Sequence, residues 1–317
     1  MIEYLACGNI MSDNVIAADG SESGWHIGGP ALFALSGARL YTENCKLVTR
    51  TGADYVDSYG KWMEDNGLTC ESIRVECDHY TRHILDYQRE DGGYNWRSVY
   101  GAQALGYIKT NPDDIDAAAS TSVKGMYMAQ NLDRVYWSKL EKIIEKYGIK
   151  MMWEIEYSDS IAYFRDPVQR IGEISNIASA WSINHNEASG LFNIPREKDE
   201  DIINEIMKLG FGFCLYRVGT RGAYGVTPSN AWFCPSFDPH GPSVDPTGCG
   251  NCSTGAAGWA WANGDDPIMT LVKANVASGY NAMQMGPVPV YTDEIMKEAA
   301  LSCYDLYNKV SKGQATE

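Results

Sequence analysis

Short apolar runs recur along the chain at intervals that leave room for a helix between them. Runs of four or five residues with the character of buried strands lie at 4–7, 46–49, 125–129, 150–153, 181–184 and 212–216. Between them the apolar positions follow a helical period, as at 31–40, 134–147 and 199–209. Strands that alternate with helices predict βαβ units and a mostly parallel sheet flanked by helices, which is an α/β fold.

The last part of the chain and two earlier segments depart from this alternation. Helical patterns follow one another at 254–262, 268–285 and 293–309. The segment 78–101 is rich in Tyr, Arg, His and Gly and shows no helical period. Together with 15–27 we interpret it as a few exposed strands outside the main sheet, with two long surface loops as the alternative. Residues 1–317 are expected to form a single domain.

Composition and charge narrow the class of protein. The 317 residues are 44% hydrophobic, which is enough for a sizeable core. The net charge of −15 argues against nucleic acid or an anionic membrane as a partner. Nine cysteines, an odd number, stand in apolar contexts and suit a reducing compartment. The sequence shows no signal peptide or membrane span, so we expect a cytoplasmic protein.

The most informative segment is 244–253, Val-Asp-Pro-Thr-Gly-Cys-Gly-Asn-Cys-Ser. Its small residues let successive backbone N–H groups converge on one point, and the helical pattern that follows places them at a helix N-terminus, where an anion is favoured. The residues expected at this anion site are Gly248, Cys249, Gly250 and Asn251. Cys249 and Cys252 also form a Cys-x-x-Cys pair, which leaves a redox site or half a zinc site as an alternative.

This segment resembles the Asp-Thr-x-Gly-Ala-Gly-Asp signature of the ribokinase-like (PfkB) sugar kinases. The resemblance implies a three-layer fold with a small β-lid over the sugar site, which often serves as a dimer interface. It also implies that ATP and Mg²⁺ are used to phosphorylate a hydroxyl of a small-molecule sugar or nucleoside. We therefore expect a homodimer through the lid, since unpaired strand edges also invite pairing with another chain.

One departure from the signature affects the mechanism. Its last Asp, the catalytic base of the family, aligns with Asn251, and an amide cannot take a proton from a hydroxyl at neutral pH. Because a general base contributes only about 10²–10⁴ in rate, the change is expected to slow the enzyme without abolishing turnover. The alternatives are a replacement base, with Asp238, His240 and Asp13 as candidates, a more acidic substrate hydroxyl, or a pseudokinase that binds nucleotide and sugar without turnover.

Further motifs of the family follow one another near the N-terminus. The segment 8–13 resembles Gly-x-x-x-x-Asp, which implies that Asp13 accepts hydrogen bonds from sugar hydroxyls; a turn or N-cap Asp is the other interpretation. Gly28 and Gly29 resemble the Gly-Gly element that lets a sugar approach the backbone. The Asn that the family carries four residues later is Phe33 here, so one polar sugar contact is expected to be missing or replaced.

The nucleotide side is expected from motifs in the second half of the chain. Asn184 and Glu187 match Asn-x-x-Glu, which the family uses near the phosphates and where Glu187 would hold magnesium through water. The same residue types also suit a helix start. The segment 217–224 resembles the Lys-x-Gly-x-x-Gly turn beside the nucleotide. The candidate contacts there are Arg217, Gly219, Arg221 and Gly222, and a hairpin with solvated arginines is the alternative. Asn275 lies in a small-residue pattern that resembles the helix under the adenine.

Two acidic residues occupy the strand at which many family members have Asp-x-Asn. Glu154 and Glu156 are two residues apart, so they point to the same side of an extended strand. They are candidates for binding a cation or substrate, and a strand end at the solvent edge of the sheet is the other interpretation. If Asn251 is simply a weakened base, the sequence alone predicts that Asn251→Asp raises turnover.

Overall fold

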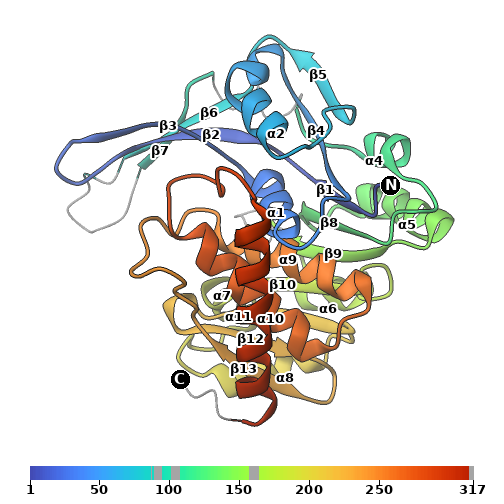
Figure 1. Ribbon diagram of the computed structural model, residues 1–317. Helices are drawn as coiled ribbons and strands as arrows, with labels where there is room; N and C mark the ends of the chain where they lie inside the picture. The colour runs from blue at the N-terminus through green and yellow to red at the C-terminus, as the bar shows by residue number, and fades with distance from the viewer. Residues whose placement is uncertain (87, 89–94, 101–107, 157–163, 314–317) are drawn as a thin grey trace.

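A nine-stranded sheet forms the centre of the computed structural model, which describes residues 1–86, 88, 95–100, 108–156 and 164–313 (Figure 1). The strands follow the order β13-β12-β11-β10-β9-β8-β1-β4-β5. In chain order they are β1 (Tyr4–Cys7), β4 (Cys45–Gly52), β5 (Ile73–Cys77), β8 (Gly125–Gln130), β9 (Lys150–Ile155), β10 (Ala180–Asn184), β11 (Phe213–Arg217), β12 (Gly222–Val226) and β13 (Ala231–Pro235). Neighbours from β5 to β11 are parallel, and β12 and β13 continue the sheet as antiparallel strands.

Helices cover both faces of this sheet, because successive side chains of each buried strand point to opposite sides. On β1, Tyr4 and Ala6 pack into one hydrophobic cluster, and Leu5 and Cys7 pack into the other. The first cluster is covered by α1 (Pro30–Arg39), α9 (Cys249–Asn263), α10 (Pro267–Asn281) and α11 (Asp293–Ser311). The second is covered by α4 (Pro112–Ala118), α5 (Arg134–Tyr147), α6 (Pro167–Ile174), α7 (His185–Phe192) and α8 (Asp199–Met207). The predicted three-layer α/β fold with a mostly parallel sheet is confirmed.

The ends of the predicted elements are close to the observed ones, with one informative exception. The helix expected at 254–262 begins at Cys249, so Asn251 lies inside its first turn. Small helical and 3₁₀ elements complete the chain: η1 (Ala53–Tyr55), η2 (Val56–Gly60), α2 (Lys61–Asp65) and η4 (Gly219–Arg221). In the part of the chain that is described, no helix has the length and apolar character that crossing a membrane requires.

A second sheet of four strands projects from one side of the main body (Figure 1). Its strands are β2 (Met11–Ile16), β3 (Glu22–Gly28), β6 (Thr81–Asp86) and β7 (Asn95–Ser98), in the order β3-β2-β6-β7. It therefore begins before residue 15, while residues 87, 89–94 and 101 of the segment 78–101 lie outside the described residues. Asp54 of η1 accepts hydrogen bonds from Tyr80 N at 2.7 Å and Arg82 Nη2 at 3.2 Å, which fastens β6 to the main body. This four-stranded sheet is called the lid below.

Close packing of α9 against α1 depends on two glycines. A Cβ on Gly37 of α1 would overlap the Cys252 carbonyl oxygen, and one on Gly255 of α9 would overlap the Ala34 carbonyl oxygen. The two backbones thus touch directly, and most of α9 is buried between α1, α10 and the sheet. This contact sets the position of the first turn of α9, which carries Asn251.

Substituting Gly255 with Ala is expected to force the two helices apart and to lower the free energy of unfolding by about 1–3 kcal/mol, the usual cost of overpacking. The matched control is Gly172→Ala in α6, where a Cβ meets nothing within 4 Å. That change is expected to be neutral or to stabilise by up to about 1 kcal/mol through helix propensity. Chemical denaturation of both variants measures the difference, and equal stabilities would contradict the packing argument.

Candidate functional site

The first turn of α9 lies beside the carboxyl ends of the central parallel strands. Gly248 is the N-cap in the left-handed conformation, with φ of 76°, so the chain turns sharply into the helix there. Of the three N–H groups expected to face an anion, that of Cys249 already donates to the Pro246 carbonyl at 3.2 Å. The N–H groups of Gly250 and Asn251 lie in the first helical turn, where no carbonyl of the helix can accept from them. Among the residues predicted at the anion site, Gly250 and Asn251 therefore have N–H groups that the helix does not use.

The Asn251 side chain joins a buried polar cluster at these strand ends. Its Nδ2 donates to Glu154 Oε2 at 2.9 Å and to the Tyr127 hydroxyl at 3.3 Å. The Tyr127 hydroxyl donates to the same Glu154 oxygen at 2.7 Å. The other oxygen, Oε1, pairs with Arg217 Nη2 at 2.8 Å. Glu154 is only 5% exposed, so the interpretation as a solvent-facing strand end is wrong for this residue.

Charge in this cluster is unevenly balanced. Arg217 Nη2 also lies 3.9 Å from Glu187 Oε2, so one guanidinium faces two carboxylates. Burial raises the pKa of Glu187, and burial followed by the charge of Glu154 raises the pKa of Tyr127 well above its usual range. The Tyr127 hydroxyl therefore stays protonated and acts as a donor. Arg217 also lies directly against Gly250, because a Cβ there would overlap its Nη1.

Asn184 and Glu187 are placed at the end of β10 and in the first turn of α7. They form a capping box in which Asn184 Oδ1 accepts from Glu187 N at 3.0 Å and Glu187 Oε2 accepts from Asn184 N at 2.8 Å. The helix-start interpretation is thus realised, and Glu187 in addition faces the Arg217 cluster. Arg221, the other arginine of the predicted turn, pairs with Asp199 of α8 at 2.6 Å.

The remaining nucleotide-side candidates have local structural roles. Gly219 and Gly222 have positive φ in the β11–β12 connection, and a Cβ on Gly222 would overlap the Cys234 carbonyl oxygen. Asn275 lies buried in α10 and donates to the Leu271 carbonyl of its own helix at 3.1 Å. In this conformation its amide is occupied inside the helix, so nothing in its surroundings supports a direct nucleotide contact.

On the other side of the α9 turn, Asp13 and Gly28 face Phe33. Asp13 and Phe33 line a cavity of about 20 Å³ between the lid and α1. The Phe33 ring is 3% exposed and fills the space beside both Gly28 and Gly248, where a Cβ would meet it. Gly29 differs from its neighbour, since a Cβ there would strike the backbone of Ile10. Phe33 therefore lines the Asp13 cavity and also packs against the turn at Gly248.

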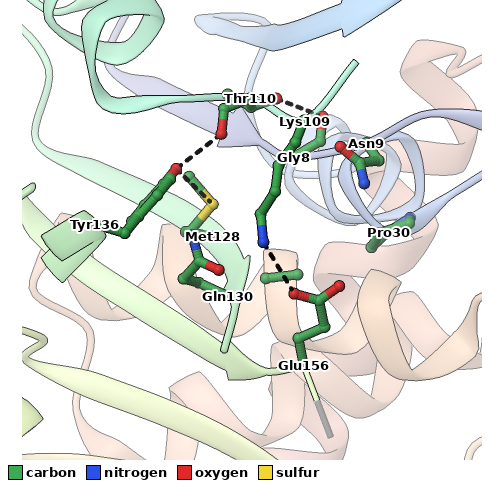
Figure 2. A pocket seen from close by; sticks show the side chains of 10 residues that line it. Gly8, Asn9, Pro30, Lys109, Thr110, Met128, Gln130, Tyr136 and Glu156 are labelled. Carbon is green, nitrogen blue, oxygen red and sulfur yellow. Dashed lines mark hydrogen bonds and ion pairs between the residues drawn. The ribbon is translucent and has the colours of Figure 1, made fainter. Parts of the chain in front are cut away.

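A second cavity, of about 60 Å³, lies at the carboxyl ends of β1 and β8 (Figure 2). Among its lining residues are Gly8, Asn9, Pro30, Lys109, Gln130 and Glu156. Figure 2 shows Lys109 and Glu156 directed toward each other, with Nζ 3.6 Å from Oε2. The buried Gln130 Nε2 has no hydrogen-bond partner within the described residues.

Two alternatives for the site lose support from the geometry. Cys249 and Cys252 are free thiols whose pKa burial raises, the opposite of a reactive thiolate. No cluster of three or more His, Cys, Asp or Glu side chains suited to a metal ion occurs among the residues with a described placement.

His240, a candidate base, lies 3.5 Å from Glu298 of α11 and packs edge-on against Tyr280.

Sequence reasoning did not identify Tyr127 as a site residue. It lies in the middle of an apolar strand, where an aromatic residue is normally part of the core. Its hydroxyl was the only available signal, since a buried Tyr usually directs that group to a partner. Glu154 was identified as a candidate, but its partners Asn251 and Arg217 come from distant parts of the chain.

The fold is a three-layer α/β arrangement in which the N-terminus of α9 lies beside the carboxyl ends of the central strands. The family model for the pfkB family carbohydrate kinases matches residues 16–290, and the chain belongs to this family. No curated protein is detectably similar to it in sequence.

Several solved structures share the fold over nearly the whole chain. A protein of E. coli assigned as a ribokinase II, in complex with ATP and Mg²⁺, is 14% identical with a TM-score of 0.73, covering 96% of this chain and 100% of that one. The ribokinase of Arabidopsis thaliana complexed with ribose and ATP is 18% identical with a TM-score of 0.71, covering 96% and 99%. The nucleoside kinase of Burkholderia thailandensis in complex with inosine is 15% identical with a TM-score of 0.69, covering 96% and 97%.

The surroundings of Asp13 predict a pH-dependent stability. Burial, together with the charge of Asp245, raises the pKa of Asp13 to about 6. His83 Nδ1 lies 3.7 Å away, but burial lowers the pKa of His83, so it supplies little positive charge at neutral pH. The folded protein therefore binds this proton more tightly than the unfolded chain. Asp13 favours folding below about pH 4, and that contribution is lost as the pH rises through 6.

Substituting Asp13 with Asn is expected to remove this loss of stability at rising pH, because an amide does not ionise. As the pH rises from 4 to 7, the free energy of unfolding of Asp13→Asn should increase by about 2–3 kcal/mol relative to that of the wild type. This is the free energy that corresponds to the shift in the pKa of Asp13. Denaturant unfolding of both proteins at pH 4, 5, 6 and 7 measures the difference. A stability difference that stays constant across this range would contradict the prediction.

Proposed function

We propose that the protein transfers the γ-phosphoryl group of ATP to a hydroxyl of a sugar or nucleoside. One observation carries this proposal: the first turn of α9 offers the N–H groups of Gly250 and Asn251, and the Arg217 guanidinium lies against the same turn. Backbone donors, a helix dipole and a cation at one point favour a phosphate group. The family and the shared fold support the same activity.

In this proposal each side of the α9 turn has its own role. The Gly250 and Asn251 N–H groups stabilise the charge of the transferring phosphoryl group, and Arg217 adds positive charge beside them. Asp13, Gly28 and the lid hold the acceptor on the other side, with the Asp13 carboxylate accepting from its hydroxyls. The acceptor oxygen forms the new bond to phosphorus, and the bond from phosphorus to the bridging oxygen breaks with its electron pair leaving on ADP.

The site offers limited protein ligation for magnesium. Glu187 is the candidate ligand, and one of its oxygens already closes the capping box with Asn184. Its side chain is 20% exposed, so the carboxylate is accessible for an outer-sphere contact through water. This fits Mg²⁺, which usually keeps several waters and is bound largely by the phosphates themselves. When bound, the ion would neutralise phosphate charge. Asn184 and Asn275 are proposed only as residues that shape the nucleotide site.

A second candidate function is a nucleotide- and sugar-binding protein without turnover. Asn251 favours it, because the carboxylate expected at this position is absent. Phe33 adds to this candidate, since an apolar ring stands at the position where the family motif carries an Asn for a sugar hydroxyl. Product formation separates the two functions, because both proteins would bind ATP and only the kinase would release ADP together with a phosphorylated acceptor.

A substrate screen is expected to show slow ATP-dependent phosphorylation. Purified protein with ATP and magnesium is incubated with pentoses, hexoses and nucleosides, among them ribose and inosine, which are bound by structural neighbours. ADP release is followed by a coupled assay, and the product is identified by mass spectrometry. The control is Arg217→Met, which removes the cation beside the turn and should reduce turnover at least tenfold. ATP binding without product for any acceptor would favour the pseudokinase.

We also propose that two copies of the chain associate through the lid. The strands β3 and β7 are the edges of this sheet, and Trp25 on β3 is 46% exposed. An open strand edge with an exposed aromatic side chain favours pairing with a second copy. Light scattering is expected to give the mass of a dimer, and Trp25→Glu should shift it toward the monomer. A monomer at high protein concentration would contradict this assembly.

A further inference from the structure

The orientation of the Asn251 amide is set by its neighbour. An ionised carboxylate only accepts hydrogen bonds, so the group that faces Glu154 at 2.9 Å must be the amide nitrogen. The Tyr127 hydroxyl donates its hydrogen to Glu154 and accepts from the same nitrogen. Glu154 Oε2 and the Tyr127 hydroxyl are only 2.7 Å apart, so they lie on the same side of the amide nitrogen and share one of its hydrogens. The remaining polar atom of the side chain is Oδ1, which can only accept.

Glu154 is itself poorly placed to remove a proton from a substrate. Its Oε1 pairs with Arg217, and its Oε2 accepts from Tyr127 and Asn251. The residue is 5% exposed, so almost none of its surface reaches a ligand. A carboxylate with this many donors serves to hold those donors in place.

We propose that Glu154 and Asn251 form an acid–amide pair, in which β9 carries the carboxylate and the helix turn carries the amide that faces the acceptor. Glu154 is a positioning residue, and Asn251 Oδ1 accepts a hydrogen bond from the hydroxyl that is to be phosphorylated. This inference rests on the proposed kinase function. As the new bond to phosphorus forms and the bond to the ADP oxygen breaks, the hydroxyl proton passes to a non-bridging oxygen of the transferred phosphoryl group.

The acid–amide pair changes the expectation for Asn251→Asp. That substitution places a carboxylate against Glu154, in a cluster where Arg217 already faces two carboxylates. Two carboxylates at hydrogen-bond distance cannot both ionise without a large penalty, so they share a proton. The introduced carboxyl group would then be held as a partner of Glu154 and would not be a free base. The structure therefore gives reason to expect slower turnover, where the sequence alone predicts faster turnover.

The test is a cycle of four proteins: wild type, Asn251→Asp, Glu154→Gln, and the double variant, which exchanges the two groups. Each single variant is expected to lower kcat at least tenfold with a smaller change in KM, because it disturbs the orientation of the acceptor. In the double variant the Gln amide on β9 can donate to the Asp carboxylate on α9. The hydrogen bond between the two positions is thereby restored, with donor and acceptor exchanged. Its kcat is expected to be within about threefold of wild type or above it. Asn230→Asp, which adds the same charge in an exposed turn, is the matched control and should change kcat less than twofold.

Thermal melts of the same proteins separate this inference from the proposed function. Asn251→Asp should melt below wild type at neutral pH, and adding Glu154→Gln should recover much of the loss. A faster Asn251→Asp enzyme, or a double variant no better than the worse single variant, would overturn the acid–amide pair. If no protein of the set turns over any acceptor, the kinase proposal fails. In that case the thermal melts alone test the pairing. Recovery of the melting temperature in the double variant supports it, and no recovery refutes it.

Discussion

The buried ion pair between Glu154 and Arg217 is the constraint around which the site is arranged. Removing two charges from water is costly, and the cost is offset only when further donors and acceptors complete their coordination. Tyr127 and Asn251 do this for Glu154, while Glu187 and the first turn of α9 flank Arg217. Because these residues come from β8, β9, β11 and two helices, the polar cluster fixes the strand ends relative to the helix that offers its N–H groups.

Much of the fold was predictable because its signals are local. Buried strands and amphipathic helices leave periodic patterns, and the glycine-rich turn before α9 marks a helix N-terminus. The contacts within the site were not predictable in the same way. Glu154 and Asn251 are 97 residues apart, and their meeting depends on how α9 is aligned along β9. That alignment follows from direct backbone contact at Gly37 and Gly255, which no pattern along the chain reveals.

Asn184 and Glu187 show a different limit. An Asn followed three residues later by a Glu is favoured at a helix start, where both side chains accept from free N–H groups, and it also matches the Asn-x-x-Glu motif, in which the Glu would hold magnesium through water. The structure realises the capping box, yet the same Glu187 also lies near Arg217. Residue type alone therefore does not separate the two roles. Asn275 and Gly222 illustrate the simpler case, in which a motif position has a sufficient explanation in its own helix or turn.

The contact between Phe33 and Gly248 means that the ring which lines the Asp13 cavity also packs against the turn that begins α9. The ring occupies the volume that any side chain at 248 would need, and the left-handed backbone there already favours glycine. Substitutions at the two positions are consequently not additive, since the cost of a Cβ at 248 depends on the size of the side chain at 33. A side chain at 248 would therefore need both a smaller residue at 33 and a backbone that tolerates the left-handed conformation.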